Sequence, residues 1–430
     1  MAKYDKVLKR LEVLHPKQID LSLGRILKLL KKLGDPHLNL PPTIHVAGTN
    51  GKGSTIAFLR SIFENNNYKV HTYTSPHLIN FNERIRVNSQ IIDNENLIEL
   101  LEECEFYNKN NPITFFEITT AAAYLCFSRK KADILLLETG LGGRFDATNV
   151  ISDKICSVLT PISMDHMTFL GTSIKSITRE KVGIFKKNTP AIISPQTIEA
   201  LEVIENEASK KNIKLFKYGS DWEIIKKGRE KFLMRVFEED FEIPKPKLFG
   251  EHQIYNAGLA ITVSKILKDF SFDKKKTFNG VRETFWPARM QRIDNGKLKE
   301  IAGKNYELWL DGGHNSHASE MLLDNLKKWK KDDLFLIFGM INGKEPKDFL
   351  KRILPLIKSL QVIPIKKHQF INSKDLQKIF KNECRIIRPE RTIQNAIKYI
   401  KSNFIGGKII ICGSLYLAGD ILKSNGSLIT

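Results

Sequence analysis

Long apolar runs are missing from this sequence of 430 residues. No window approaches the roughly 18 uninterrupted apolar residues of a membrane-spanning helix, and the N-terminal stretch MAKYDKVLKRLEVLHP has no apolar core of the kind that a secretion signal needs. Internal repeats and low-complexity tracts are missing as well, which argues against a repeat array or a disordered chain. These absences predict a globular protein that stays in the cytoplasm.

Cysteine is also scarce, with five residues that lie far apart in the sequence and form no C-x-x-C pair. This spacing is not typical of a metal site, and a catalytic thiol is a weaker interpretation than a buried one. We expect reduced thiols in a reducing compartment, most of them buried. The five residues are Cys104, Cys126, Cys156, Cys384 and Cys412.

Acidic residues are outnumbered, since 68 lysines and arginines against 48 aspartates and glutamates leave a formal net charge of +20. Such an excess can indicate a nucleic-acid partner. Here the lysines scatter in short runs such as SRKKAD and KKWKKDD and form no stripe with interleaved aromatic residues. We predict no nucleic-acid and no membrane partner, and a basic surface that attracts anionic substrates such as nucleotides.

The stretch HVAGTNGKGST, residues 45–55, joins a β-branched run to a helix-like stretch. A glycine-rich turn in that place presents backbone N–H groups at a positive helix N-terminus, which suits a phosphate chain. The spacing departs from the common P-loop pattern, because Val46 stands where that pattern has glycine and Gly53 where it has a hydroxyl. An ordinary glycine-rich turn with an incidental lysine remains the alternative for this stretch alone.

Short apolar runs such as TIHVAG, DILLLETG and ICSVLTPI alternate with helical stretches from residue 43 onward, which predicts a mainly parallel sheet covered by helices. Residues 214–244 are predicted to form short antiparallel strands. Beyond residue 297 strand-like apolar runs alternate with helical stretches a second time. We therefore expect an α/β protein with a P-loop-containing sheet domain over residues 1–290, a smaller Rossmann-like α/β domain over 297–430 and a linker near 285–297.

Acidic and histidine residues follow two of the expected strands. Glu138 ends DILLLE, and Asp165 and His166 follow ICSVLTPI. All three are expected at the carboxyl edge of the sheet, where ligands bind in such folds. A carboxylate there can hold magnesium against phosphate oxygens. Each residue also has a structural interpretation, as a group that hydrogen-bonds the neighbouring backbone.

Three further charged residues stand out in the sequence. Lys181 lies in a helical pattern with apolar flanks, where a buried ammonium is costly, so by itself it is better explained by a side chain that reaches solvent. Asp311 ends the run ELWL. Arg289 lies in WPARMQR at the expected domain junction, where a guanidinium can bind a phosphate through two hydrogen bonds.

Taken together, the motifs resemble the folylpolyglutamate synthase and dihydrofolate synthase family, relatives of the Mur ligases. The resemblance runs in order from about residue 20 to residue 420 and includes HVAGTNGKGST, TFFEITTAAAYLCF, ETGLGGRFDATN, ISMDHMTFLGTSIKSITREKVGIFK, WPARMQRI and LDGGHNSHA. It implies an ATP-dependent ligase that activates a carboxylate as an acyl phosphate and couples it to L-glutamate. The acceptors would be 7,8-dihydropteroate and tetrahydrofolate mono- and polyglutamates, as in the bacterial bifunctional enzymes.

Three alternatives to this bifunctional enzyme remain. A monofunctional folylpolyglutamate synthase uses the same ATP and glutamate machinery, so the motifs separate the two poorly. A Mur ligase of cell-wall synthesis is more distant, because the phosphate turn starts at residue 48 and leaves little room for a preceding nucleotide-sugar domain. A P-loop ATPase acting on nucleic acid is suggested by net charge alone.

The resemblance also implies the site, with catalysis by Lys52, Lys181 and His166. ATP would be bound by Asn50, Gly51, Lys52, Gly53, Ser54, Asn256, Arg289 and Asp311. Two magnesium ions would be held by Ser75, Glu138, His166 and a carbamate formed on Lys181. Dihydropteroate would contact Thr114, Phe115, Phe116, Glu117, Phe145, Asp146 and Ala147, although the rings of Phe115 and Phe116 by themselves are better explained as core. A monomer is expected.

Three positions depart from the family pattern. Ala288 replaces the glycine before the arginine, and Ser316 replaces the proline of DGAHNP. Both changes are small and keep the key side chains. Gly343 stands where FGMxxDKD has aspartate, which leaves that loop without a predicted role.

Overall fold

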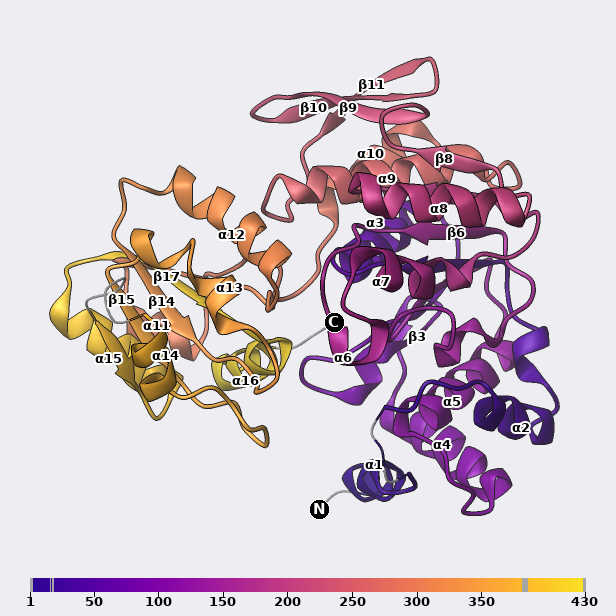
Figure 1. Ribbon diagram of the computed structural model, residues 1–430, viewed down its shortest axis with the longest axis horizontal. Coiled ribbons are helices and arrows are strands. Elements are labelled where there is room, and N and C mark those ends of the chain that lie inside the picture. Colours follow the sequence, from indigo (N-terminus) through magenta and orange to yellow (C-terminus); the bar gives the residue numbers. More distant parts are fainter. Residues whose placement is uncertain (1–2, 16, 18, 381–385, 428–430) are drawn as a thin grey trace. The chain divides into compact units, whose positions relative to one another are not determined.

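Two mainly parallel sheets form the framework of the chain, one in each of two units (Figure 1). The computed structural model describes residues 3–15, 17, 19–380 and 386–427. The first unit comprises Met1–His77, Asn82–Lys247 and Gln253–Thr284, and the second comprises Leu78–Phe81, Leu248–His252 and Phe285–Thr430. The predicted α/β fold with two mainly parallel sheets is confirmed.

The first unit contains an eight-stranded sheet in the order β4-β3-β2-β5-β1-β6-β7-β8. Its strands are β1 (Thr43–Ala47), β2 (Val70–Tyr73), β3 (Ile85–Val87), β4 (Gln90–Ile91), β5 (Ile134–Glu138), β6 (Cys156–Leu159), β7 (Ala191–Ile193) and β8 (Leu215–Lys217). Neighbouring strands are parallel except at the β2–β3 and β3–β4 pairs. Every residue of β1 and β5 is buried, as expected for parallel strands that are covered on both faces.

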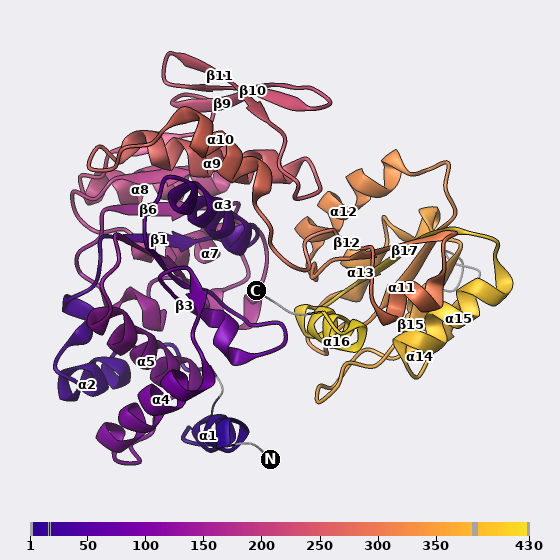
Figure 2. The same ribbon diagram turned by 180° about the vertical axis from the view of Figure 1, so that it is seen from behind.

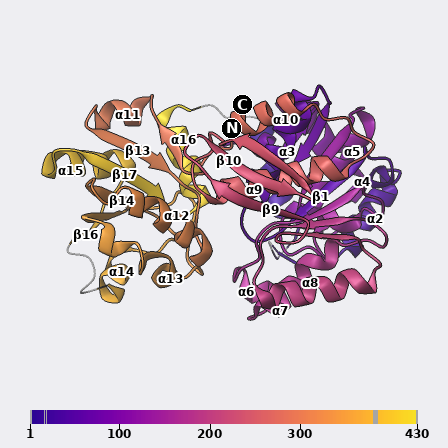
Figure 3. The same cartoon turned by 90° about the horizontal axis from the view of Figure 1, so that it is seen from above.

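Helices and 3-10 turns connect and cover these strands. The helices are α1 (Lys3–Glu12), α2 (Gly24–Lys32), α3 (Lys52–Asn65), α4 (Asn94–Asn108), α5 (Phe115–Arg129), α6 (Met167–Leu170), α7 (Ile174–Lys181), α8 (Ile198–Lys210), α9 (His252–Ile266) and α10 (Lys274–Glu283). The 3-10 turns are η1 (Pro36–Leu38), η2 (Phe81–Arg84), η3 (Ala147–Val150) and η4 (Val182–Ile184). Figure 3 shows α3 with α10 and α7 with α8 as two pairs on opposite sides of the first unit.

A small antiparallel sheet packs against α9. Its strands are β9 (Trp222–Lys227), β10 (Lys231–Val236) and β11 (Glu239–Pro244), in the order β11-β10-β9 (Figure 2). The prediction of antiparallel strands is confirmed for these three, but it is wrong for residues 215–217, which form β8 and pair in parallel with β7. The reason is α8, whose crossover from β7 returns the chain in the same direction.

The second unit has a six-stranded sheet in the order β12-β13-β17-β14-β15-β16, antiparallel only at the β12–β13 pair. Its strands are β12 (Gln291–Ile293), β13 (Tyr306–Leu310), β14 (Leu334–Phe338), β15 (Ser359–Val362), β16 (Ile387–Pro389) and β17 (Gly407–Cys412). Its helical elements are α11 (Lys297–Ala302), α12 (Ser316–Lys328), α13 (Pro346–Leu350), η5 (Leu354–Leu356), α14 (Ser373–Ile379), α15 (Ile393–Asn403) and α16 (Leu415–Asn425). Two clusters of buried apolar side chains pack around this sheet.

Two expectations from composition can be compared with the structure. Cys104, Cys126, Cys156 and Cys412 are buried and free, which confirms the prediction for them, whereas Cys384 lies outside the described residues. In the part of the chain that is described, no helix combines the length and the hydropathy needed to cross a membrane.

The helix that follows the phosphate turn, α3, packs closely against α10. A Cβ atom added to Gly280 of α10 would lie 2.8 Å from the carbonyl oxygen of Ser61 and 2.9 Å from the Cα of Ile62. The Ser61 hydroxyl donates to the Gly280 carbonyl at 2.8 Å. The two helix backbones therefore touch at a point where only glycine fits.

We expect Gly280→Ala to lower the free energy of unfolding by about 1–3 kcal/mol, because the added methyl group overpacks this contact. Equilibrium unfolding in urea measures the change. The control is Gly24→Ala at the first residue of α2, where an added Cβ would meet no atom within 4 Å. Equal stability of the two variants would contradict the close packing of α10 on α3.

Candidate functional site

The phosphate turn lies between the end of β1 and the first residue of α3. Gly48 has φ 148° and Gly51 has φ 90°, values in the region that favours glycine. A Cβ atom on Gly48 would also lie 1.9 Å from the Thr160 hydroxyl oxygen. No side chain caps α3, so its first N–H groups point out of the helix toward the turn. This geometry suits an anion.

Two lysines bind the same carbonyl group of the turn. Lys52 Nζ donates to the Gly48 carbonyl at 3.2 Å and to the Thr49 carbonyl at 3.3 Å. Lys181 Nζ, at the last residue of α7, donates to the Gly48 carbonyl at 2.9 Å. Lys181 is 5% exposed, so the interpretation that its side chain reaches solvent is wrong.

Lys181 has an unusual charge state for a lysine. Burial first, and the charge of Lys52 second, lower its pKa to about 7, while Asp165 and Asp146 act in the opposite direction. At neutral pH Lys181 is therefore a neutral amine in a substantial fraction of the molecules. A neutral amine is a nucleophile and can react with carbon dioxide, whereas an ammonium cannot.

The predicted metal ligands lie at the carboxyl edge of the first sheet. Glu138 is the buried last residue of β5, and the backbone N–H of Ser75 donates to its Oε2 at 3.1 Å. His166 follows β6 in a left-handed conformation, with its side chain 41% exposed and its Nε2 4.0 Å from the Asp165 carboxylate. Carboxylate oxygens such as those of Glu138 suit a hard divalent cation.

A metal at this edge requires more than the histidine and acidic residues. Among the residues with described positions, no group of three or more His, Cys, Asp and Glu side chains could hold a metal ion. The predicted set includes only two such side chains, Glu138 and His166, together with Ser75 and Lys181. An unmodified Lys181 would repel a cation, so the set fits magnesium only if that lysine carries an anionic group.

The start of α5 combines two predicted acceptor residues in a capping box. Glu117 N–H donates to the Thr114 hydroxyl at 3.2 Å, and Thr114 N–H donates to Glu117 Oε2 at 2.8 Å. Arg25 Nε donates to the same Oε2 at 3.0 Å. Glu117 Oε1 is buried and has no hydrogen-bond partner among the residues that the structure describes, so it remains an acceptor for a ligand.

Sequence reasoning missed Arg25. Its guanidinium also binds the carboxylate and the backbone carbonyl of Asp20, at 3.2 and 2.8 Å. The signal was present, because Arg25 precedes the buried Leu29 of α2 by four residues and so lies on the buried face of that helix. An arginine on such a face needs a buried acidic partner.

The aromatic acceptor residues differ in exposure. Phe115 and Phe116 are half-buried, and the Phe116 ring lies 6.2 Å from the buried Tyr73 ring, so both rings are part of the core on one side only. A Cβ atom on Gly140 would lie 2.4 Å from the Phe116 ring, which therefore rests on that glycine. Phe145 is 40% exposed, and the Arg144 guanidinium lies 5.2 Å from its ring centre.

The turn of residues 140–150 is joined closely to the segment that carries Lys181. Arg144 N–H donates to the Glu180 carbonyl at 2.7 Å, and Asn149 Nδ2 donates to the Gly183 carbonyl at 3.1 Å. A Cβ atom on Gly183 would lie 2.4 Å from the Cα of Arg144. The structure thus brings the predicted acceptor turn and the predicted carbamate lysine together.

The remaining predicted ATP contacts lie in both units. Asn256 in α9 is buried beside the phosphate turn, since a Cβ atom on Gly51 would lie 2.7 Å from its Oδ1. In the second unit, Asp311 accepts from the N–H groups of Met290 and Gly313 at 2.9 and 2.7 Å. Burial raises the pKa of Asp311, and the charge of Arg289 acts in the opposite direction.

Two of the departures from the family pattern involve left-handed backbone. Ala288 has φ 55°, so alanine occupies here the conformation that favours the glycine of the family pattern. Gly343 has φ 84°, a conformation that glycine adopts at little cost. Ser316 begins α12 after Asn315, whose side chain accepts from Ala318 N–H at 2.9 Å and caps the helix.

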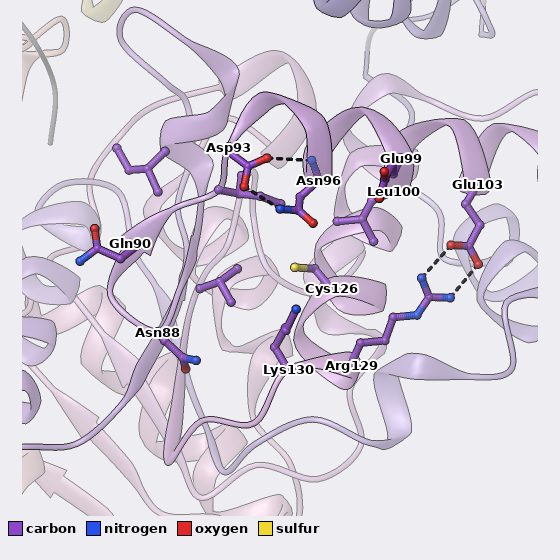
Figure 4. Close-up of a pocket in the computed structure, with 13 residues that line it drawn as sticks. Asn88, Gln90, Asp93, Asn96, Glu99, Leu100, Glu103, Cys126, Arg129 and Lys130 are labelled. Carbon is purple, nitrogen blue, oxygen red and sulfur yellow. Dashed lines mark hydrogen bonds and ion pairs between the residues drawn. The ribbon is translucent and has the colours of Figure 1, made fainter.

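A separate pocket of about 410 Å³ lies over the β3–β4 hairpin, α4 and the end of α5 (Figure 4). None of the predicted site residues lines it. Asp93 caps α4 through Asn96, and Glu103 binds Arg129 through two hydrogen bonds of 2.7 Å. The pocket therefore adds no reactive group to the site at the phosphate turn.

Comparison with known proteins gives consistent matches. Residues 46–264 match the Mur ligase middle domain, and residues 291–424 match the dihydrofolate synthetase C-terminal domain. A Bacillus subtilis dihydrofolate synthase/folylpolyglutamate synthase is 32% identical, with 94% of each chain covered.

Two solved structures agree with these matches. E. coli FolC in complex with DHPP and ADP has a TM-score of 0.88 and 26% identity, covering 98% of this chain and 97% of that one. A folylpolyglutamate synthase from Thermotoga maritima has a TM-score of 0.80 and 30% identity, covering 98% and 96%.

We expect Arg25→Met to lower the free energy of unfolding by about 2 kcal/mol, because it leaves the buried Glu117 carboxylate without its cation. Urea unfolding measures the loss. The matched control is Arg129→Met, which breaks an exposed arginine–carboxylate pair and is expected to cost less than about 1 kcal/mol. If both variants lose the same stability, the Arg25–Glu117 pair has no special role.

Proposed function

The chain belongs to the dihydrofolate synthase/folylpolyglutamate synthase family of ATP-dependent ligases, and on this premise we propose that it adds L-glutamate to 7,8-dihydropteroate and to tetrahydrofolate mono- and polyglutamates. The reaction proceeds through an acyl phosphate on the acceptor carboxylate. The observation that carries the proposal is the meeting of Lys52 and Lys181 on the Gly48 carbonyl. This contact places the Lys52 side chain and the readily deprotonated amine of Lys181 together at the glycine turn that precedes α3.

The proposed chemistry needs positive charge beside the phosphates, which Lys52 supplies. A carboxylate is a poor electrophile until one of its oxygens becomes a good leaving group. In the first step an acceptor oxygen attacks the γ-phosphorus of ATP and ADP leaves, and Lys52 stabilises the charge on the β and γ oxygens. In the second step the amine of glutamate attacks the acyl carbon and loses a proton, and the tetrahedral intermediate expels phosphate.

Lys181 acts in this proposal as a carbamate. Its neutral amine adds to the carbon of carbon dioxide and loses one proton, which leaves an anionic oxygen donor on a buried side chain. That modification removes the repulsion between an ammonium and a cation. Magnesium held by this carbamate, Ser75, Glu138 and His166 would neutralise phosphate oxygens and orient the γ-phosphate.

The other site residues receive roles under the same proposal. Asn50, Gly51, Gly53 and Ser54 surround the triphosphate, with Asn256 beside them. The two units act as two lobes, and the second, which includes Phe285–Thr430, brings Arg289 and Asp311 to ATP when the lobes close. The acceptor binds at the start of α5 and at the turn of residues 140–150: Thr114, Phe115, Phe116, Glu117, Phe145, Asp146 and Ala147. The working enzyme is a monomer.

We expect ATP turnover only when L-glutamate and a pteroate or folate acceptor are both present, because the acyl phosphate needs both partners to complete the cycle. With ¹⁸O in the acceptor carboxylate, one labelled oxygen passes into inorganic phosphate, as mass spectrometry detects. Running 7,8-dihydropteroate and tetrahydrofolate in parallel separates the bifunctional enzyme from a monofunctional folylpolyglutamate synthase.

Omission of glutamate is the control, since phosphate release then stays at background. Unlabelled phosphate in a reaction that forms product would disprove the acyl phosphate. Turnover stimulated by single-stranded nucleic acid, in place of the acceptor, would favour the nucleic-acid ATPase instead.

We expect Lys181→Ala to lose most activity and to regain part of it when short carboxylic acids such as acetate are added, because these supply the missing oxygen donor. Steady-state rates with and without acetate measure the rescue. The matched control is Lys175→Ala, on the same helix, whose exposed side chain pairs with Glu202 at 3.0 Å. Normal activity of Lys181→Ala without acetate would remove the carbamate from the mechanism.

A further inference from the structure

A chain of hydrogen bonds crosses the buried face of β1 beneath the site. Lys154 Nζ bonds His45 Nδ1 at 3.1 Å, and His45 Nε2 bonds the Thr148 hydroxyl at 2.9 Å. The Thr148 hydroxyl in turn bonds Asp146 Oδ1. Lys154 Nζ also donates to the carbonyl oxygen of Ile184. All of these bonds are made by side chains, so none belongs to the backbone hydrogen bonds that form the strands and helices.

The members of this chain are deeply buried. Lys154 is 5% exposed, His45 and Thr148 are not exposed at all, and Asp146 is 2% exposed. Burial and the nearby Lys154 lower the pKa of His45 well below its ordinary value, so its ring is neutral at neutral pH. A neutral imidazole has one donor nitrogen and one acceptor nitrogen, which makes the chain directional.

The direction follows from the carboxylate end. Asp146 accepts backbone N–H groups from Leu141 at 2.7 Å and from Thr148 at 3.0 Å. The Thr148 hydroxyl also donates to Asp146 Oδ1, and since a hydroxyl has one proton it must itself accept from His45 Nε2–H. His45 Nδ1 then carries the lone pair that accepts from Lys154. Bonds aligned in one direction polarise and strengthen one another.

The chain fixes both sides of the site. At one end Asp146 closes the turn that presents Phe145, and the Tyr124 hydroxyl of α5 donates to the Thr148 carbonyl at 2.7 Å. At the other end Lys154 binds Ile184, three residues after Lys181. One buried amine thus ties the segment after α7 to the turn of residues 140–150.

We propose that His45, Lys154 and Thr148 are positioning residues for the pteroate or folate acceptor. Their hydrogen bonds orient the Asp146 carboxylate, and with it the acceptor turn, without contact with the reacting atoms. The inference rests on the proposed function, because it assigns the turn of residues 140–150 to the acceptor. A role in stability alone is the competing explanation, and the two differ in what they do to acceptor binding.

The decisive variant is Thr148→Val, which keeps the side-chain shape and the backbone N–H bond to Asp146 but removes the hydroxyl from the middle of the chain. The KM for 7,8-dihydropteroate should rise about tenfold, the change expected when a buried donor loses its partner, while the KM for ATP stays within about twofold. Thr148→Ser restores the hydroxyl and should restore the acceptor KM.

The matched control is Thr262→Val in α9, where a fully buried hydroxyl donates to the Gly258 carbonyl of its own helix at 2.8 Å. This variant should lose stability without a change in either KM. An unchanged acceptor KM in Thr148→Val, or equal increases in the KM values for acceptor and ATP, would overturn the inference. An active wild type distinguishes that result from a failure of the proposed function, which would show as no turnover with either acceptor.

A second measurement is independent of activity. Histidine ¹⁵N NMR of the full chain reports which ring nitrogen of His45 carries the proton, and the signal is assigned by its change in Thr148→Val. The inference requires the Nε2–H tautomer, protected from exchange with water in the wild type and less protected in the variant. The Nδ1–H tautomer would reverse the direction of the chain and overturn it.

Discussion

The site depends on the position of one carbonyl group, that of Gly48. It accepts from Lys52 and Lys181, and only glycine can place it there, because a Cβ atom would collide with Thr160. Two ammonium groups this close repel each other strongly in a buried place, and the lowered pKa of Lys181 relieves that repulsion. The same constraint that packs the turn against β6 therefore leaves an amine of lowered pKa beside the glycine turn that precedes α3.

Close backbone packing extends this constraint to the rest of the site. The turn of residues 140–150 and the segment after α7 approach so closely that glycine is required at Gly183, where a Cβ atom would meet Arg144. Side chains then complete the joint, as Asn149 does with the Gly183 carbonyl. Loops are usually the mobile parts of an α/β protein. Here they are bonded to one another, which suits the proposed reaction, because that reaction needs its reactants held in a fixed geometry.

Sequence patterns predicted the fold better than the environment of single residues. Alternating apolar runs were enough for two mainly parallel sheets, because buried parallel strands have a clear composition. The pairing of β8 was missed, since a short strand carries no signal of direction and only the crossover through α8 determines it. Burial of Lys181 and the partner of Arg25 were missed for a related reason: both depend on contacts between residues distant in sequence.

The strand β1 shows how polar function is built into a core. All five of its residues are buried, yet Thr43 and His45 alternate with Ile44 and Val46. Such alternation usually indicates a strand with one wet face. In β1 the polar side chain of His45 contacts Lys154 and Thr148 instead of water. Both of its ring nitrogens are hydrogen-bonded. Because a buried polar group without a partner is costly, His45 constrains its partners as strongly as they constrain it. Polar alternation in a strand next to a phosphate turn can therefore indicate a buried network that supports the site.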